Sequence, residues 1–134
     1  MKLKKFINRN LTNQSETREH HEDAALQTHY FKTTKQKAYK AAEAVFQREG
    51  YTILSSSEER GEISVNFKGK KKAFIVTSIV MVKPFRTAID FNVTTESGGP
   101  FDFGFSRRTI IDIYTELKKN LPYIETSMAD RISE

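Results

Sequence analysis

Cysteine is absent from the 134 residues, and this absence excludes several kinds of site. The chain forms no disulfide, no thiolate zinc site and no cysteine nucleophile. A reducing compartment suits such a chain, so we expect a cytoplasmic protein. Long apolar runs are absent too. The most apolar stretch, residues 73–82, falls short of the roughly 20 residues that a membrane-spanning helix requires, so we expect no transmembrane segment.

Catalytic signatures are also missing from the sequence. It contains no P-loop, no Gly-x-Gly-x-x-Gly turn, no His-Glu-x-x-His helix and no Gly-x-Ser-x-Gly elbow. Residues 102–104 spell the Asp-Phe-Gly tripeptide of protein kinases, but the glycine-rich loop and the His-Arg-Asp loop that accompany it there are absent. His20 and His21 lie beside two acids, yet adjacent residues seldom converge on one metal ion. We predict a protein that is not an enzyme and uses no cofactor, although a fold can still bring separate carboxylates together.

Positive charge is spread along the chain. Lysine and arginine number 22 against 17 acidic residues, which gives a net charge of +5. Nucleic-acid binders usually concentrate their charge on one face, so we expect no nucleic-acid partner. The one dense cluster is Lys68, Lys70, Lys71 and Lys72. Its simplest interpretation is a solvated hairpin tip that keeps strand edges from aggregating.

Residues 1–25 are polar and lack a sustained hydrophobic period, which predicts a flexible leader. The start has the basic residues of a signal peptide without its apolar core or cleavage site. Within residues 2–11, apolar side chains recur at helical spacing among lysines and an arginine. A short basic amphipathic helix of this kind is able to lie on an anionic membrane, so peripheral membrane contact through residues 2–11 is one alternative.

The remaining pattern predicts a single domain at residues 26–122 and a fraying tail at 123–134. We expect a strand at 26–32, then a helix at 35–49 that Thr34 caps and Gly50 closes. A last helix over 107–120 should begin at Ser106, after an extended lead-in that carries Phe101, Phe103 and Phe105. Between the helices lie four strands whose connections are short enough for hairpins, at 51–55, 62–68, 73–82 and 86–96.

The element order is therefore β-α-β-β-β-β-α. An antiparallel meander with a helix at each end favours an α+β two-layer sandwich, with two helices packed on one face of the sheet.

The strand at 73–82 is apolar on both faces, whereas its neighbours alternate between apolar and polar residues. Such a strand is central and covered on both sides. Two orientations of this strand are possible. In the first, the helices cover Phe74, Val76, Val80 and Val82, and the second face, for a partner or a cover, consists of Ile75, Ile79 and Met81. In the second orientation the two faces are exchanged. Residues 1–25, a loop or another subunit would supply the cover. The strip is about one strand wide, which is small for an obligate interface and favours cover within the chain.

Arg107 and Arg108 open the last predicted helix. Free amides and the dipole favour anions at a helix start, and two arginines strengthen this preference. Together with Lys70, Lys71 and Lys72 they are candidate contacts for an anion or a membrane surface. The alternative is that these arginines pair with Asp102 or Asp112.

Four stretches carry a resemblance: residues 57–65 (SEERGEISV), 83–88 (KPFRTA), 93–96 (VTTE) and 100–104 (PFDFG). Together they resemble a family of small, uncharacterised cytosolic proteins of Gram-positive bacilli. The resemblance spans most of residues 15–120 and implies no activity or catalytic residue. The order of elements is also similar to helix-grip modules, which bind proteins or apolar ligands, by analogy of fold alone.

Our leading hypothesis is a non-enzymatic binding or scaffold protein that uses its sheet for self-association or for a protein partner. A second hypothesis is a module that binds anions or a membrane surface through its basic residues. A third is a carrier for a small hydrophobic ligand held between the sheet and the helices.

Overall fold

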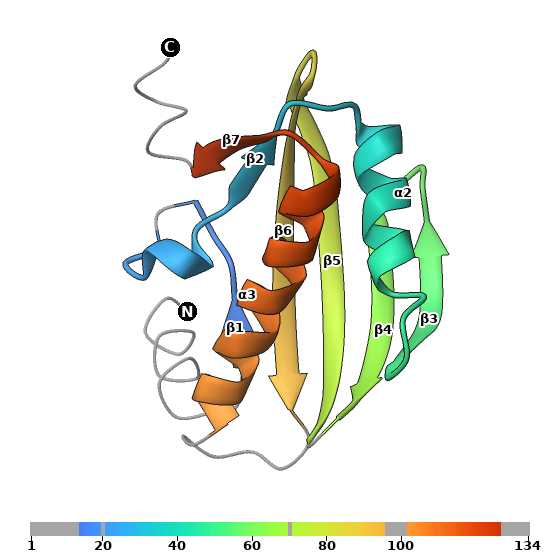
Figure 1. Cartoon of the computed structure of the whole chain (residues 1–134), viewed down its shortest axis with the longest axis vertical. Coiled ribbons are helices and arrows are strands. Elements are labelled where there is room, and N and C mark those ends of the chain that lie inside the picture. The colour runs from blue at the N-terminus through green and yellow to red at the C-terminus, as the bar shows by residue number, and fades with distance from the viewer. Residues whose placement is uncertain (1–13, 20, 70, 96–101, 127–134) are drawn as a thin grey trace.

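The computed structural model describes residues 14–19, 21–69, 71–95 and 102–126. In these residues two helices lie on one face of an antiparallel sheet, as Figure 1 shows. The predicted α+β two-layer arrangement is therefore confirmed.

The helices and strands follow one another as β1 (Gln14–Glu16), η1 (Ala24–Leu26, a 3-10 helix), β2 (His29–Phe31), α2 (Lys35–Val45), β3 (Tyr51–Ser57), β4 (Glu62–Lys68), β5 (Lys72–Lys83), β6 (Arg86–Thr95), α3 (Asp102–Asn120) and β7 (Tyr123–Thr126). Across the sheet the order is β3-β4-β5-β6-β2-β7. β1 pairs with the same edge of β6 as β2 does, β1 at residues 92–94 and β2 at residues 87–89. The predicted meander thus forms the run from β3 to β6.

The turn between β3 and β4 depends on Gly61. Its backbone has a φ of +70°, a conformation that side chains disfavour. A Cβ at this position would also lie 2.2 Å from the carbonyl oxygen of Ile79. The backbone N–H of Ile79 donates to the Gly61 carbonyl at 2.7 Å, so this turn packs directly against β5.

Apolar side chains of the helices fill the space over one face of the sheet. In α2 the small side chains of Ala38 and Ala42 are fully buried, which allows a close approach to the strands. In α3 the largest fully buried side chain is that of Tyr114, which donates its hydroxyl hydrogen to the Ile89 carbonyl at 2.6 Å. The facing strands contribute the buried side chains of Ile63, Val65, Ile75, Ile79, Ile89, Phe91 and Val93.

The last helix begins earlier than predicted. α3 starts at Asp102, so Ser106 lies inside the helix and is completely buried rather than capping it. Ser106, Ile110, Ile113 and Leu117 are all buried at helical spacing, so the helical period extends upstream of residue 107. The extended lead-in expected for the phenylalanines is therefore wrong from Asp102 onward.

Both predicted tails are partly structured. Residues 14–16 form β1, and the Thr17 N–H donates to the Phe91 carbonyl at 2.8 Å. β6 is ten residues long and β2 occupies only a small part of its edge, so the rest of the edge is open to this segment. At the other end residues 123–126 form β7 on β2. The predictions of a flexible leader and a fraying tail are corrected for these residues, and the amphipathic stretch at 2–11 lies outside the described residues.

Candidate binding face of the sheet

The two faces of β5 differ in what covers them. Ile75 and Ile79 are buried beneath the helices, with 0% and 1% of their surface exposed. Phe74 points the other way and is 41% exposed. Of the two predicted orientations of β5, the structure has the one in which Ile75 and Ile79 face the helices. The assignment of these two residues to a partner face is therefore corrected. They turn inward because their partners Val65 and Ile89 are themselves core residues. Met81 is exposed, but it lies near the end of the β5–β6 hairpin.

Polar side chains flank the apolar strip on this outer side. Phe74 lies between Asn66 of β4 and Thr94 of β6, and Val76 lies between Ser64 and Asn92. We call these six outward-facing residues the open face: Ser64, Asn66, Phe74, Val76, Asn92 and Thr94. Its apolar part is one strand wide, as the sequence predicts.

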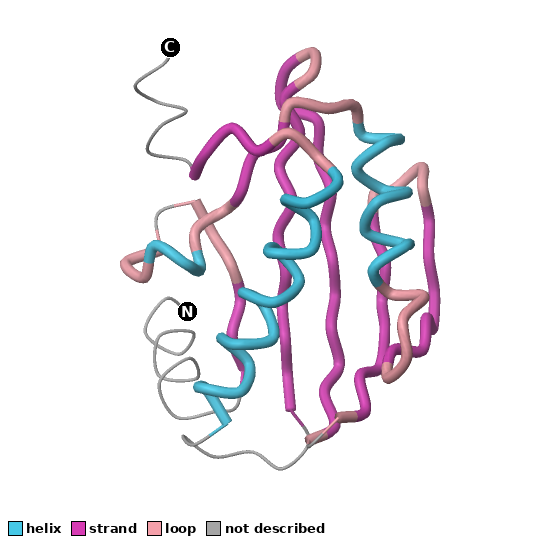
Figure 2. Tube along the Cα trace, viewed as in Figure 1, coloured by secondary structure: helices cyan, strands magenta, loops and turns pink. Residues whose placement is uncertain are grey.

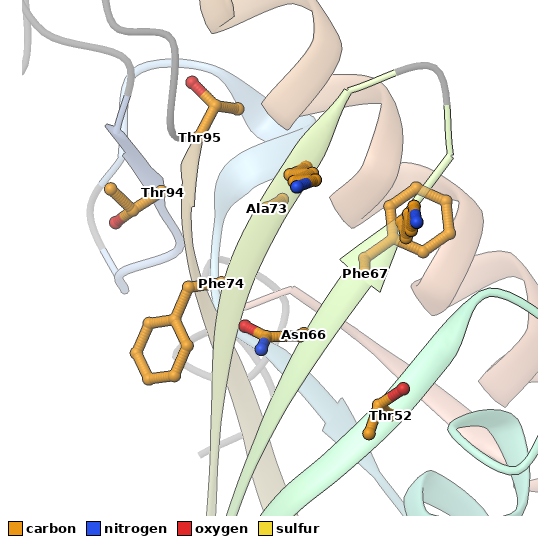
Figure 3. A pocket seen from close by; sticks show the side chains of 9 residues that line it. Thr52, Asn66, Phe67, Ala73, Phe74, Thr94 and Thr95 are labelled. Atoms are coloured by element: carbon orange, nitrogen blue, oxygen red, sulfur yellow. The ribbon is translucent and has the colours of Figure 1, made fainter.

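A basic hollow of about 560 Å³ opens at one side of Phe74. Lys68 and Lys72 line it and are direct cross-strand partners, so two positive charges lie opposite each other. Like charges at such positions repel, and a bound anion would relieve that repulsion. Figure 3 shows Phe74 and Asn66 on adjacent strands at this hollow, so an aromatic ring and an amide line it together with the two lysines.

An acidic hollow of about 670 Å³ lies on the other side of Phe74. Residues 16–19 form one wall, and Glu16 accepts a hydrogen bond from the Asn92 side-chain amide at 2.9 Å. Glu19 lies on the same wall and accepts a hydrogen bond from the Tyr30 hydroxyl. Arg18 contributes one positive charge to the wall.

Asp90 supplies a third carboxylate to the acidic hollow. Its Oδ1 accepts hydrogen bonds from the hydroxyls of Thr17, at 2.6 Å, and Thr28, at 2.7 Å. Burial raises the pKa of the Asp90 carboxyl, and the two hydroxyl hydrogen bonds oppose that rise. This cluster joins residues from β6, the segment after β1 and the segment before β2. The open face thus changes from basic through apolar to acidic across Phe74.

The residues predicted to bind an anion do not converge. Lys70 lies outside the described residues, while Lys71 and Lys72 lie at the β4–β5 turn. Arg107 donates from Nε to Asp23 at 2.6 Å and so ties η1 to α3. This ion pair lowers the pKa of Asp23, a partner not predicted for Arg107 from the sequence; the predicted pairing with Asp102 concerns a side chain outside the described ones. Arg108 lines a separate hollow beside Tyr51 and Phe105.

The two described histidines, His21 and His29, make contacts within the fold. His29 is 4% exposed, and its ring stacks on Tyr114 with ring centroids 3.6 Å apart. His21 accepts a hydrogen bond at Nδ1 from the Asp23 N–H at 3.0 Å, and His20 lies outside the described residues. Within the part of the chain that the structure describes, no three histidine or acidic side chains are grouped as a metal site.

Comparison with family models, with curated proteins and with solved structures finds no significant match to this chain. The resemblance to a family from Gram-positive bacilli therefore stays a prediction. Among the described residues, no helix has the length and apolar character needed to cross a membrane.

Sequence reasoning missed the acidic hollow and the role of Lys68 in the basic one. The strand pattern places Asp90 on an outward position but gives no sign that Thr17 and Thr28 reach it, since they are 73 and 62 residues away in the chain. The sequence predicts a solvated turn for Lys68, because it does not show that Lys68 and Phe74 line the same hollow.

Proposed function

We propose that the protein is a non-enzymatic binding protein that takes a segment of a protein partner onto the open face of its sheet. The observation that carries this proposal is the exposed ring of Phe74 between a basic and an acidic hollow. An aromatic side chain left 41% exposed, with charges of opposite sign at its two sides, contributes little to folding and fits recognition of a ligand.

The charges define the chemistry of the partner segment. An apolar side chain would pack on Phe74 and Val76, an acidic one would lie between Lys68 and Lys72, and a basic one would reach Glu16 and Asp90. An apolar strip one strand wide matches a short extended segment better than a large rigid surface. We place this binding in the cytoplasm, a proposal that rests on the absence of cysteine.

The test selects short peptides from a random display library on the immobilised full-length protein. Enriched peptides should share an acidic, an apolar and a basic position. Phe74→Ala should weaken their binding by about tenfold, the loss of ~1.4 kcal/mol. Lys72→Glu should weaken binding and shift a new selection away from acidic residues. Leu54→Ser is the matched control, since Leu54 is an exposed apolar residue on β3, at 52%, and lines neither hollow.

Two results would overturn the proposal. One is that no peptide is enriched, or that enriched peptides bind Phe74→Ala as tightly as the unmodified protein. The other is a dimer in light scattering that Phe74→Ala dissociates, because a second copy would then occupy the open face.

The other two hypotheses have less support. A carrier needs a cavity between the sheet and the helices, where the large side chains of Phe31, Phe46, Phe91 and Tyr114 are fully buried. An anion site at the start of α3 would need Arg107, whose guanidinium already pairs with Asp23.

A further inference from the structure

Exposed apolar side chains gather at the tip of the hairpin that joins β5 and β6. Six large apolar side chains are exposed among the described residues, and four of them belong to this tip. They are Val80 at 56%, Met81 at 45%, Val82 at 48% and Phe85 at 62%. We call these four residues the hairpin tip. They lie beyond the two hollows of the open face, so their exposure needs a separate explanation.

The shape of the tip is convex. In Figures 1 and 2 the β5–β6 turn projects past the other loops at its end of the molecule. Val80 and Met81 are consecutive in a strand, so their side chains point to opposite faces of the hairpin. A flat protein surface would contact one face of such a projection, whereas a fluid phase contacts all of its sides.

The backbone at the tip suits an apolar medium. Lys83 pairs with Arg86 across the turn, and Pro84 has no N–H to desolvate. Phe85 has a φ of +59°, a conformation in which glycine is favoured over residues with side chains. An aromatic residue that is strained and largely exposed gives folding no evident benefit, and such strain is typical of functional positions.

Basic residues surround the tip. Lys83 and Arg86 flank its turn, and Lys32 lies next to Phe31, which pairs with Thr87. The N–H of Lys32 donates to the Pro122 carbonyl at 2.8 Å, so the end of α3, with Lys118 and Lys119, belongs to the same end of the molecule. Glu58 and Glu59 in the β3–β4 turn offset part of this charge, as does Glu116, which pairs with Lys119 at 3.1 Å.

We propose that the hairpin tip docks on an anionic lipid surface. Phe85, Met81 and Val82 enter the boundary between head groups and acyl chains, while the surrounding lysines and Arg86 contact anionic head groups. A convex apolar tip ringed by positive charge is complementary to a fluid, negatively charged layer. This inference uses other residues than the peptide-binding proposal and does not depend on it.

Vesicle co-sedimentation of the full chain tests the proposal, with phosphatidylcholine vesicles that contain or lack phosphatidylserine. We expect binding to the vesicles with phosphatidylserine, and weaker binding as salt is raised, since salt screens surface charges. Phe85→Gly should lower the binding by about tenfold and keep the fold, because glycine accepts the positive φ. Met81→Ser should also lower it.

Two variants serve as controls and should bind vesicles like the unmodified protein: Phe74→Ala on the open face and Leu54→Ser on β3. The proposal is overturned if Phe85→Gly binds as well as the unmodified protein, if phosphatidylserine makes no difference, or if no vesicle is bound. It is equally overturned if light scattering shows a dimer that Phe85→Gly dissociates, because the tip would then contact a second copy.

Discussion

His29 should make the protein lose stability in mild acid. The residue lies on β2, almost fully buried, with its ring stacked on Tyr114. Its Nδ1 lies 2.8 Å from the Gln27 carbonyl, and a carbonyl only accepts, so Nδ1 carries the proton of the neutral ring. Burial lowers the pKa of His29 from 6.5 to about 4, and the nearby charge of Lys118 acts in the same direction.

The size of the effect follows from the two pKa values. Between pH 6.5 and 4 the unfolded chain binds a proton at His29 that the folded protein largely refuses, so stability falls as the pH falls. Each pH unit in this window corresponds to about 1.36 kcal/mol. Lowering the pH from 7.5 to 4 should therefore cost about 3 kcal/mol through this residue alone.

Urea denaturation of two variants isolates this contribution from that of the carboxylates. His29→Asn keeps a donor near the Gln27 carbonyl, and His29→Phe keeps an aromatic ring against Tyr114, while neither side chain titrates. Each variant should be less stable than the unmodified protein at pH 7.5, because it loses one of these interactions. Between pH 7.5 and pH 4 the difference in unfolding free energy between each variant and the unmodified protein should shift by about 3 kcal/mol in favour of the variant. An equal stability difference at both pH values would refute the reasoning, as would an NMR titration that places the His29 pKa near 6.5.

Two further predictions concern buried polar side chains. Thr77 Oγ1 is buried without a hydrogen-bond partner in the part of the chain that is described, so Thr77→Val should raise the free energy of unfolding by about 1 kcal/mol. The control Thr87→Val removes a 2.7 Å hydrogen bond to the Thr33 carbonyl and should lower the free energy of unfolding by about 1 kcal/mol. If urea denaturation shows that the two variants change this free energy in the same direction, the prediction is contradicted. Burial raises the pKa of Asp90 above its value in the unfolded chain. The contribution of Asp90 to the free energy of unfolding is therefore fully present in acid and is lost as the pH rises through the pKa of the folded protein. The variant Asp90→Asn can still accept hydrogen bonds from the two threonine hydroxyls. It should therefore be more stable than the unmodified protein at pH 7 but not at pH 3. A loss of stability at pH 7 would contradict the claim that the buried charge of Asp90 destabilises the fold.

Much of the fold could be predicted because it is encoded locally. The strands from β3 to β6 follow one another through short turns, and the alternation in residues 62–68 sets which side of β4 is buried. The same rule fails for β5, where residues 74–82 are apolar on both sides. Its orientation is fixed by cross-strand neighbours, since Ile75 pairs with Val65 and Ile79 with Ile89. No pattern within β5 could have chosen between its faces.

The errors at the chain ends have a different cause. Residues 14–17 are polar, so their composition predicts disorder, yet they pair with the part of β6 that β2 does not reach. Backbone hydrogen bonds to an existing strand require no apolar side chains. The contacts of Asp23 with Arg107 and of Asp90 with Thr17 likewise join residues far apart in the sequence. Such pairings depend on the finished fold and leave no local signal.

The segment at residues 16–19 also changes the meaning of the second apolar face of β5. The sequence favours cover for this face from within the chain, but residues 16–19 border the face and leave Phe74 exposed. By lying along one side they add Glu16 and Glu19 to an acidic wall, while Lys72, which precedes Phe74 on the same side of β5, lies with Lys68 at one end of the strip. A narrow apolar strip with lysines at one end and an acidic wall along one side would fix both the position and the direction of an extended segment, because reversing that segment would place like charges together. A flat apolar face of equal area would not distinguish between the two directions of a bound segment. The charged borders of the strip therefore support the proposed binding of a short segment more than its apolar area does.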